Sequence, residues 1–194
     1  MERQRQPRVR NGRGVTLIEM LIVVAIIGIV AAIALPRIDL TRIRVDTAMQ
    51  TAGTTLLAAQ RFAVTRGHDV IVGFDQANGL MRVLHDADND GTAGAGERVR
   101  NYPLGDQVVF GLGGAAPHPI GANAVNFSQT RDGLLAVTFH RSGSASEFGG
   151  VYLTSRRAAL AAGRSMDTRV LQIERSTGRA SWFRYTGAAW SQGF

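Results

Sequence analysis

One long apolar segment near the N-terminus constrains this chain more than any other feature. The segment extends from Val15 to Leu35, contains Glu19 as its single charged residue, and ends at Pro36. A helix rises about 1.5 Å per residue, so these 21 residues would span about 30 Å, the thickness of the hydrocarbon core of a bilayer. We therefore predict a transmembrane helix over residues 15–35.

Glu19 lies near one end of this predicted span. A carboxylate inside a bilayer costs up to about 3 kcal/mol on insertion scales, so the residue is expected to have a function and a cationic partner. The obvious partner is an amine.

The charge of the first residues predicts how the span is oriented. Residues 1–14 contain five arginines and one glutamate, and cytoplasmic flanks carry the excess of positive charge. The N-terminus is therefore predicted to be cytoplasmic and the chain after Pro36 to lie on the outer side. The formal charge of +7 divides into +4 for residues 1–14, −2 for residues 15–130 and +5 from Arg131 onward. The chain has no cysteine, which is compatible with any compartment.

A secretory signal peptide is the main alternative for this segment. Ala32-Ile33-Ala34 resembles the small-residue site at which such peptides are cut. The run is longer than an ordinary signal-peptide core, contains Glu19, and is followed by a helical pattern instead of the start of a new domain. These three features favour an anchor.

The helical pattern continues beyond Pro36 in residues 36–67. Apolar residues recur there at intervals of three and four, and Gly67 is a plausible C-cap. The repeating positions are Val45, Met49, Ala52, Leu56, Ala59 and Ala63. One helix from Val15 to about Arg66 is predicted, lipid-embedded in its first half and packed on a folded domain in its second. Pro36 is a candidate for a kink in it.

Residues 68–194 show the pattern of short strands separated by turns. Val70, Val72 and Phe74 alternate, and Asn78-Gly79 is a hairpin signal before a partner strand over residues 80–85. Further strands are predicted over residues 98–102, 108–112, 135–139, 150–153, 170–174 and 179–185. One long helix followed by many antiparallel strands defines the α+β class.

The N-terminal residues resemble those of a known family. The order of basic leader, Gly14, Thr16-Leu17-Ile18-Glu19, apolar helix and Pro36 is similar to the class III signal of type IV pilins and type II secretion pseudopilins. The resemblance implies that a prepilin peptidase cuts between Gly14 and Val15 on the cytoplasmic face and methylates Val15. It also implies a single-pass protein of the bacterial inner membrane with a periplasmic pilin-fold head. Val15 departs from the phenylalanine that most members carry there.

The later part of the chain resembles one branch of that family, the minor pseudopilins named for GspH and FimT. The similar segments are residues 135–139, His140-Arg141-Ser142-Gly143-Ser144, residues 149–153, residues 170–174 and Thr177-Gly178-Arg179. The resemblance implies a non-enzymatic subunit at or near the tip of a type II secretion pseudopilus. Its partners would be other major and minor pseudopilins, and Glu19 and Pro36 would serve assembly. The alternative it leaves open is a type IV pilus minor pilin of FimT type, with the inner membrane again as anchor and DNA as an additional partner.

An acidic segment between two predicted strands has the spacing of a calcium loop. Asp86, Asp88, Asp90 and Glu97 occupy positions 1, 3, 5 and 12 of such a loop, and Thr92 offers a backbone carbonyl. Strands, not the helices of an EF-hand, are expected to flank it. Calcium binding and an ordinary polar turn both remain open, and no other cofactor is expected.

Basic residues in the C-terminal part suggest a possible nucleic-acid surface. Arg179 and Arg184 are the principal candidates for phosphate contacts in the DNA-binding alternative, with Trp182 or Tyr185 for stacking. The arginines considered with them are Arg156, Arg157, Arg164 and Arg169. The acidic residues interspersed among these arginines favour an ordinary solvated face.

The sequence shows no catalytic set. His68, His85, His118 and His140 lack a metal-binding spacing and are expected to be surface or strand residues, and Ser142 and Ser144 lack a nucleophile elbow. A membrane-anchored periplasmic enzyme is therefore the least favoured class, and we expect no enzymatic activity.

Overall fold

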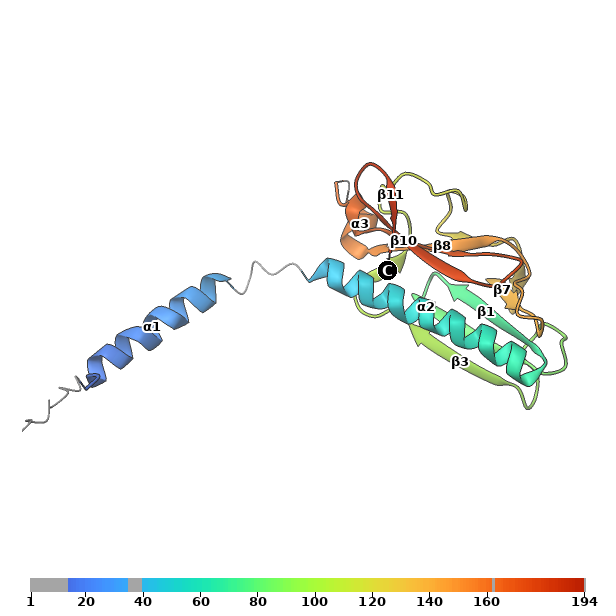
Figure 1. The fold of residues 1–194 in the computed structure, drawn as a ribbon, viewed down its shortest axis with the longest axis horizontal. Coiled ribbons are helices and arrows are strands. Elements are labelled where there is room, and N and C mark those ends of the chain that lie inside the picture. Colours follow the sequence, from blue (N-terminus) through green and yellow to red (C-terminus); the bar gives the residue numbers. More distant parts are fainter. Residues whose placement is uncertain (1–13, 35–39, 162, 194) are drawn as a thin grey trace, which may run out of the picture. The chain divides into compact units, whose positions relative to one another are not determined.

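The computed structural model describes residues 14–34, 40–161 and 163–193, which belong to two compact units (Figure 1). The first unit, residues 1–39, contains helix α1, Leu17–Ala34. The second unit, residues 40–194, is the head, which contains helix α2 and all the strands. Within the described ranges, no helix combines the length and the apolar character needed to cross a membrane.

Helix α1 begins at a side-chain cap. The Thr16 hydroxyl accepts a hydrogen bond from the backbone N–H of Glu19 at 3.2 Å, and the Thr16 carbonyl accepts one from Met20. Such a cap satisfies a backbone donor that has no partner within the helix. The helix therefore starts two residues after the predicted position at Val15, because Thr16 serves as its cap.

Helix α2, Thr41–Arg66, confirms the second half of the predicted helix. All six predicted apolar positions are buried, from Val45 to Ala63, and Gly67 ends the helix with φ +75° and an N–H bond to the Ala63 carbonyl. Residues 35–39, which include Pro36, lie outside the described residues, so the predicted continuity between the two helices stays a prediction.

The head contains two antiparallel sheets. The first has the strand order β3-β2-β1-β7-β6 and the second the order β11-β10-β9-β8-β4, with β5 paired to β8. The strands of the first sheet are β1 (Asp69–Asp75), β2 (Leu80–Asp86), β3 (Arg98–Pro103), β6 (Thr130–Arg131) and β7 (Leu134–Phe139). Those of the second are β4 (Val108–Phe110), β5 (Val125–Asn126), β8 (Gly149–Ser155), β9 (Arg169–Ile173), β10 (Ala180–Tyr185) and β11 (Trp190–Gln192). All eight predicted strands and the α+β class are confirmed, whereas β5, β6 and β11 were not predicted.

Helix α2 packs against both sheets and so forms the centre of the core (Figure 1). Its buried face meets Phe74 and Phe139 of the first sheet and Leu153 and Leu171 of the second within one apolar cluster. Each large apolar side chain buried in this way contributes about 1.5–3 kcal/mol relative to exposure. The helix is thus the element that joins the two sheets.

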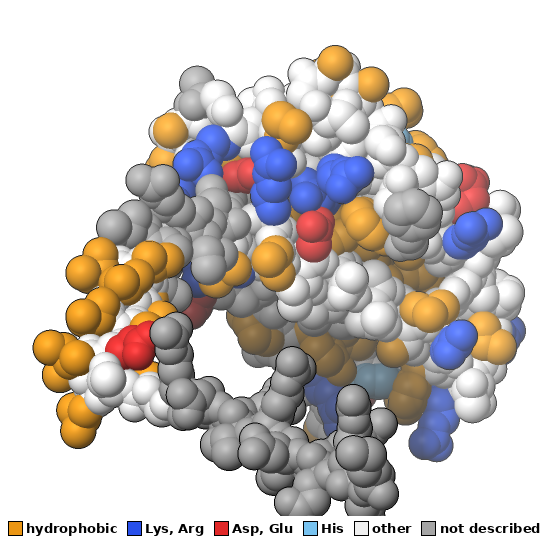
Figure 2. Space-filling model, turned by 60° about the vertical axis from the view of Figure 1, so that its left-hand side comes forward, with side chains coloured by type: hydrophobic (Ala, Val, Ile, Leu, Met, Phe, Trp, Pro, Cys, Tyr) orange, Lys and Arg blue, Asp and Glu red, His pale blue; other side chains and the backbone are white. Residues whose placement is uncertain are grey.

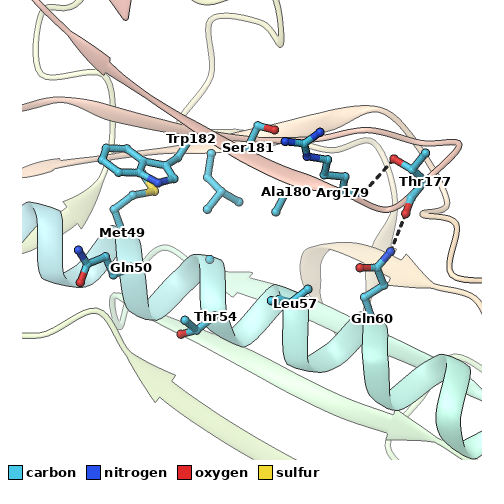
Figure 3. Close-up of a pocket in the computed structure, with 12 residues that line it drawn as sticks. Met49, Gln50, Thr54, Leu57, Gln60, Thr177, Arg179, Ala180, Ser181 and Trp182 are labelled. Atoms are coloured by element: carbon cyan, nitrogen blue, oxygen red, sulfur yellow. Dashed lines mark hydrogen bonds between the residues drawn. The ribbon is translucent and has the colours of Figure 1, made fainter. Parts of the chain in front are cut away.

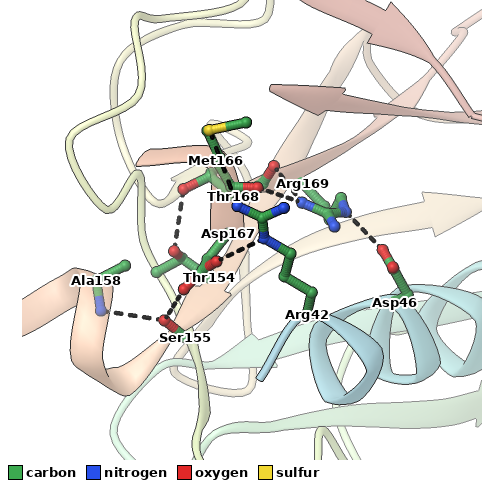
Figure 4. A network of polar contacts seen from close by, with 9 residues as sticks. All are labelled: Arg42, Asp46, Thr154, Ser155, Ala158, Met166, Asp167, Thr168 and Arg169. Atoms are coloured by element: carbon green, nitrogen blue, oxygen red, sulfur yellow. Dashed lines mark hydrogen bonds and ion pairs between the residues drawn. The ribbon is translucent and has the colours of Figure 1, made fainter. Parts of the chain in front are cut away.

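The connection between β8 and β9 carries two short helices, α3 (Arg156–Leu160) and the 3₁₀ turn η2 (Ser165–Asp167). The hydroxyl of Ser155 caps α3 by accepting the Ala158 N–H at 3.1 Å, and it donates to Asp167 Oδ2 at 2.9 Å. Asp167 is 4% exposed and forms an ion pair with Arg42 of α2, 3.5 Å between Nε and Oδ1 (Figure 4).

A buried arginine holds the same connection against α2. The Arg169 side chain is 1% exposed and donates from Nε to Asp46 Oδ1 at 2.6 Å. Its Nη1 donates to the carbonyls of Met166 and Thr168, at 2.9 and 3.1 Å (Figure 4). Charged hydrogen bonds of this kind are stronger than neutral ones, so the first turns of α2 are firmly joined to the start of β9.

Candidate functional site

The predicted cleavage site lies in exposed chain ahead of α1. Gly14 and Val15 are both exposed and precede the Thr16 cap, and a Cβ added to Gly14 would meet no atom within 4 Å. Glu19 is exposed in the first turn of α1, where a carboxylate interacts favourably with the helix dipole. The Gly14–Val15 peptide bond is therefore accessible, and an acid stands one helical turn beyond it.

The acidic loop between β2 and β3 brings three of its predicted ligands together. One carboxylate oxygen from each of Asp86, Asp88 and Glu97 lies within 4.8 Å of the others. Strands flank the loop on both sides, as predicted. Three oxygens at this spacing are a partial set for a calcium ion, which takes six to eight.

The loop also satisfies its carboxylates from its own backbone. Asp86 accepts the N–H groups of Asp90 and Gly91, at 3.1 and 3.0 Å, and Glu97 accepts those of Ala87 and Gly94, at 2.6 and 2.9 Å. Asp90 accepts both the N–H and the hydroxyl of Thr92, at 2.7 and 2.9 Å. Asp90 thus interacts with Thr92 and is not one of the three carboxylates that converge.

The two ends of this loop differ in their acidity. Burial raises the pKa of the Asp86 carboxyl, although the Gly91 N–H partly offsets that effect, and Glu97 and Asp88 raise it further. The Gly94 N–H lowers the pKa of Glu97. A cation in the loop would therefore compete with protons mainly at Asp86, which is 2% exposed.

A groove of ≈ 530 Å³ runs between α2 and β10 (Figure 3). Met49, Leu57 and Trp182 give it an apolar lining, and Arg179 stands at its rim. At one end, Gln60 Nε2 donates to the carbonyls of Gly143 and Thr177, at 2.8 and 2.6 Å. The groove can accept an apolar side chain with a polar or anionic group beside Arg179.

The turn that presents Arg179 depends on a glycine. Gly178 has φ +62°, and a Cβ there would collide with the Gly143 carbonyl and the Gln60 side chain. The turn closes with hydrogen bonds between Glu174 and the Gly178 N–H, 2.8 Å, and between Glu174 N–H and Arg179, 2.9 Å. Ser176, Thr177 and Gly178 thus form a tight turn, which fixes the position of Arg179 next to the groove.

The structure separates the arginines that were predicted to form one phosphate-binding surface. Arg179 is exposed just before β10, and Arg184 is exposed on β10. Arg169 is buried against Asp46, so its inclusion in that surface was wrong. Tyr185 is 7% exposed, which also excludes it as a stacking platform, and Trp182 is partly buried in the core.

The histidines have environments that the sequence did not reveal. His118 is 9% exposed and packs against Phe183 and Trp190, with ring centroids 4.7 and 5.6 Å apart, so the prediction of a surface or strand residue was wrong for it. Burial lowers its pKa. His140 Nδ1 lies 2.8 Å from Asp69 Oδ2, a pairing that the sequence did not reveal because the two residues are 71 positions apart.

Comparison with known proteins identifies the N-terminal signal. Residues 9–35 match the family model of the prokaryotic N-terminal methylation motif, which covers Gly14, Val15 and Glu19. No curated protein and no solved structure matches the chain. The match supports a type IV pilin-like protein. The motif implies processing by a prepilin peptidase, a membrane anchor and assembly with other pilins.

Proposed function

We propose that this protein is a minor pseudopilin, a non-enzymatic structural subunit at or near the tip of a type II secretion pseudopilus. The methylation motif at residues 9–35 is the observation that carries the proposal. The head supports it, because one helix packed on antiparallel sheets gives a filament subunit a compact domain beyond its anchor. The resemblance of residues 135–179 to the family named for GspH and FimT favours the minor subunit.

In this proposal the N-terminal part of the chain has three successive roles. Residues 1–14 are a cytoplasmic leader that prepilin peptidase removes, residues 15–35 anchor the protein in the inner membrane, and residues 36–67 continue into the head. The side chains of α1 that the structure describes, up to Ala31, are all exposed and almost all apolar, as a lipid-facing helix requires. Residues 68–194 form the periplasmic domain.

Glu19 supplies the assembly contact. Cleavage after Gly14 frees an α-ammonium at Val15, and a neighbouring subunit that enters the filament brings this cation to the level of the carboxylate in the first turn of α1. A charge pair is far less costly in lipid than either charge alone. The pairing selects a processed subunit, because an uncleaved chain has no amine at Val15.

A type IV pilus minor pilin of FimT type that binds DNA is the alternative function. Arg179 and Arg184 favour it, because both are exposed and neither has an ion pair among the described residues. The apolar lining of the neighbouring groove and the loss of Arg169 from the surface favour a protein partner instead.

Binding measurements on the full, processed chain distinguish the two functions. We expect it to bind the other minor pseudopilins and to show no tight binding to duplex DNA at physiological salt. Tight DNA binding with a log–log salt slope of roughly −0.9 per phosphate would overturn the proposal in favour of the alternative. In that case Arg179→Ala and Arg184→Ala would flatten the slope, whereas Arg141→Ala, at an exposed site elsewhere, would not.

We further propose that the acidic loop binds Ca²⁺ through Asp86, Asp88 and Glu97, with Asp90 and the Thr92 carbonyl recruited when the ion arrives. Saturating calcium should stabilise the chain by mass action, by about 2.7 kcal/mol at one hundred times the dissociation constant. Thermal unfolding with and without calcium measures this gain. Asp88→Ala should abolish it and Asp106→Ala, an exposed carboxylate outside the loop, should retain it. An unchanged melting temperature in millimolar calcium would identify the loop as an ordinary turn.

A further inference from the structure

One end of the head combines exposed apolar side chains with arginines. We call it the α3 end, formed by residues 40–44 at the start of α2, residues 156–161 and residues 163–166. Its apolar members are Leu160, Ile43, Leu40 and Met166, exposed by 82, 61, 44 and 42%. Figure 2 turns this side of the head forward and shows blue basic side chains gathered on it, with some red acidic side chains among them and orange apolar side chains nearby.

Contacts between the two segments make the α3 end a single surface. Arg42 of α2 pairs with Asp167 at 3.5 Å, and its Nη2 lies 3.9 Å from the Met166 sulfur (Figure 4). The Arg169–Asp46 pair joins the same elements one layer deeper. The exposed groups therefore keep fixed positions relative to one another.

The surface is strongly positive. Its exposed cations are Arg42, Arg44, Arg156, Arg157 and Arg164. Asp167 accepts the Ser155 hydroxyl and pairs with Arg42, so it offsets one of these cations, whereas Asp46 pairs with the buried Arg169. The exposed Asp106 lines a second groove together with Ile43 and Arg44. Its single negative charge offsets only part of the positive charge of the surface. The complementary partner is therefore anionic.

The apolar side chains specify what kind of anionic partner fits. Leu160 projects from the last residue of α3 and Ile43 from the first turn of α2, and neither is covered by the described part of the head. Arginines around exposed leucine and isoleucine are typical of surfaces that lie in the headgroup region of a bilayer, with the apolar groups inserted and the cations on lipid phosphates. A nucleic acid would use the arginines but leave Leu160 in water.

We propose that the α3 end docks on the anionic headgroup surface of the membrane that holds the anchor. This inference rests on the proposed function, which places α1 in the bilayer. The order of elements along the chain favours it, because Thr41 follows Ala34 by seven residues, and such a connection reaches at most about 25 Å. Docking would hold an unassembled subunit flat against the membrane until it enters a filament.

Site-specific labelling tests the docking, and the absence of native cysteine makes it direct. The full, processed chain carrying Leu160→Cys is labelled with an environment-sensitive fluorophore and reconstituted in phosphatidylcholine vesicles with or without phosphatidylglycerol. We expect a blue shift and shielding from an aqueous quencher only when phosphatidylglycerol is present. The matched control is Ser176→Cys, in the exposed turn at the opposite end of β9, which should stay accessible in both vesicles.

Charge variants complete the test. Each arginine near an anionic surface contributes about fivefold, so Arg156→Gln combined with Arg157→Gln should lower the ratio of docked to undocked heads by roughly twenty-fivefold at low salt. Any of three results would overturn the proposal: equal shielding in both kinds of vesicle, shielding that rises with protein density, or equal shielding by duplex DNA in phosphatidylcholine vesicles. Alkaline extraction reports the anchor separately: an inserted chain with an accessible label refutes only the docking, whereas an extracted chain refutes the anchor and the docking with it.

Discussion

Replacing Gly14 with glutamate is expected to leave the entire leader attached to the protein. In the proposed function the cut follows Gly14, which is exposed ahead of α1, and we expect a longer acidic side chain to occupy the space that the peptidase needs for the backbone. The mass of the chain in the membrane fraction measures the result, which should be all or none. A native chain beginning at Leu35 instead of Val15 would refute the pilin-like signal and support a secretory signal peptide.

Glu19→Ala is the matched control for processing, because it changes the first turn of α1 without touching the cleaved bond. We expect this variant to be cut at Val15 and yet to fail in assembly, since the new α-ammonium of the neighbouring subunit would lack its carboxylate partner. Secretion by cells that carry only this variant measures assembly. Normal secretion would contradict the proposed pairing.

Asp46→Ala is expected to destabilise the head by about 3 kcal/mol. Among the described residues, the substitution leaves the buried Arg169 guanidinium with only the carbonyls of Met166 and Thr168 as partners, and breaking a buried ion pair costs about 3–5 kcal/mol. The value lies at the lower end because the Asp46 side chain is 39% exposed, so water can replace part of the lost interaction. Chemical unfolding of the full chain in detergent micelles measures the change.

The double variant Asp46→Ala with Arg169→Met separates the pair from the rest of the packing. Removing both charges leaves no unpaired buried cation, and an apolar replacement of similar size is often neutral, so most of the lost stability should return. If the double variant is as unstable as the sum of the single variants, the ion pair does not account for the effect.

The parts of the fold that could be predicted are those with a strong local pattern. The apolar stripe of α2 follows the helical period, and the alternation in β1 with the turn before β2 follows the strand period, so each element shows its type within a few residues. The boundary of α2 at Gly67 was predictable for a related reason, because the positive φ of a helix C-cap favours glycine.

The parts that could not be predicted depend on tertiary contacts. β5 and β6 have two residues each and become strands only because β8 and β7 lie beside them. α3 has five residues, too few for a periodic signal, and its cap depends on Asp167 from a later turn. The division of the strands between two sheets, both of which pack against α2, likewise has no local signal in the sequence.

The candidate sites show the same division. The spacing of the acidic loop predicted which carboxylates meet, because Asp86, Asp88 and Glu97 are close in sequence and lie between two paired strands. Nothing local distinguishes Arg169 from the exposed Arg179, or His118 from the other histidines. Their burial depends on Asp46 and on Phe183, which are far away in the chain.

The central position of α2 has a consequence for how the head folds. Its contacts with the second sheet join residues that are 117 and 123 positions apart, Gln60 with Thr177 and Asp46 with Arg169. Contacts of such long range slow folding, because a large loop must close before they form. The part of the apolar face of α2 that packs on the second sheet therefore stays uncovered until the last strands of the chain are in place. The protein depends on that interval being short or protected from aggregation.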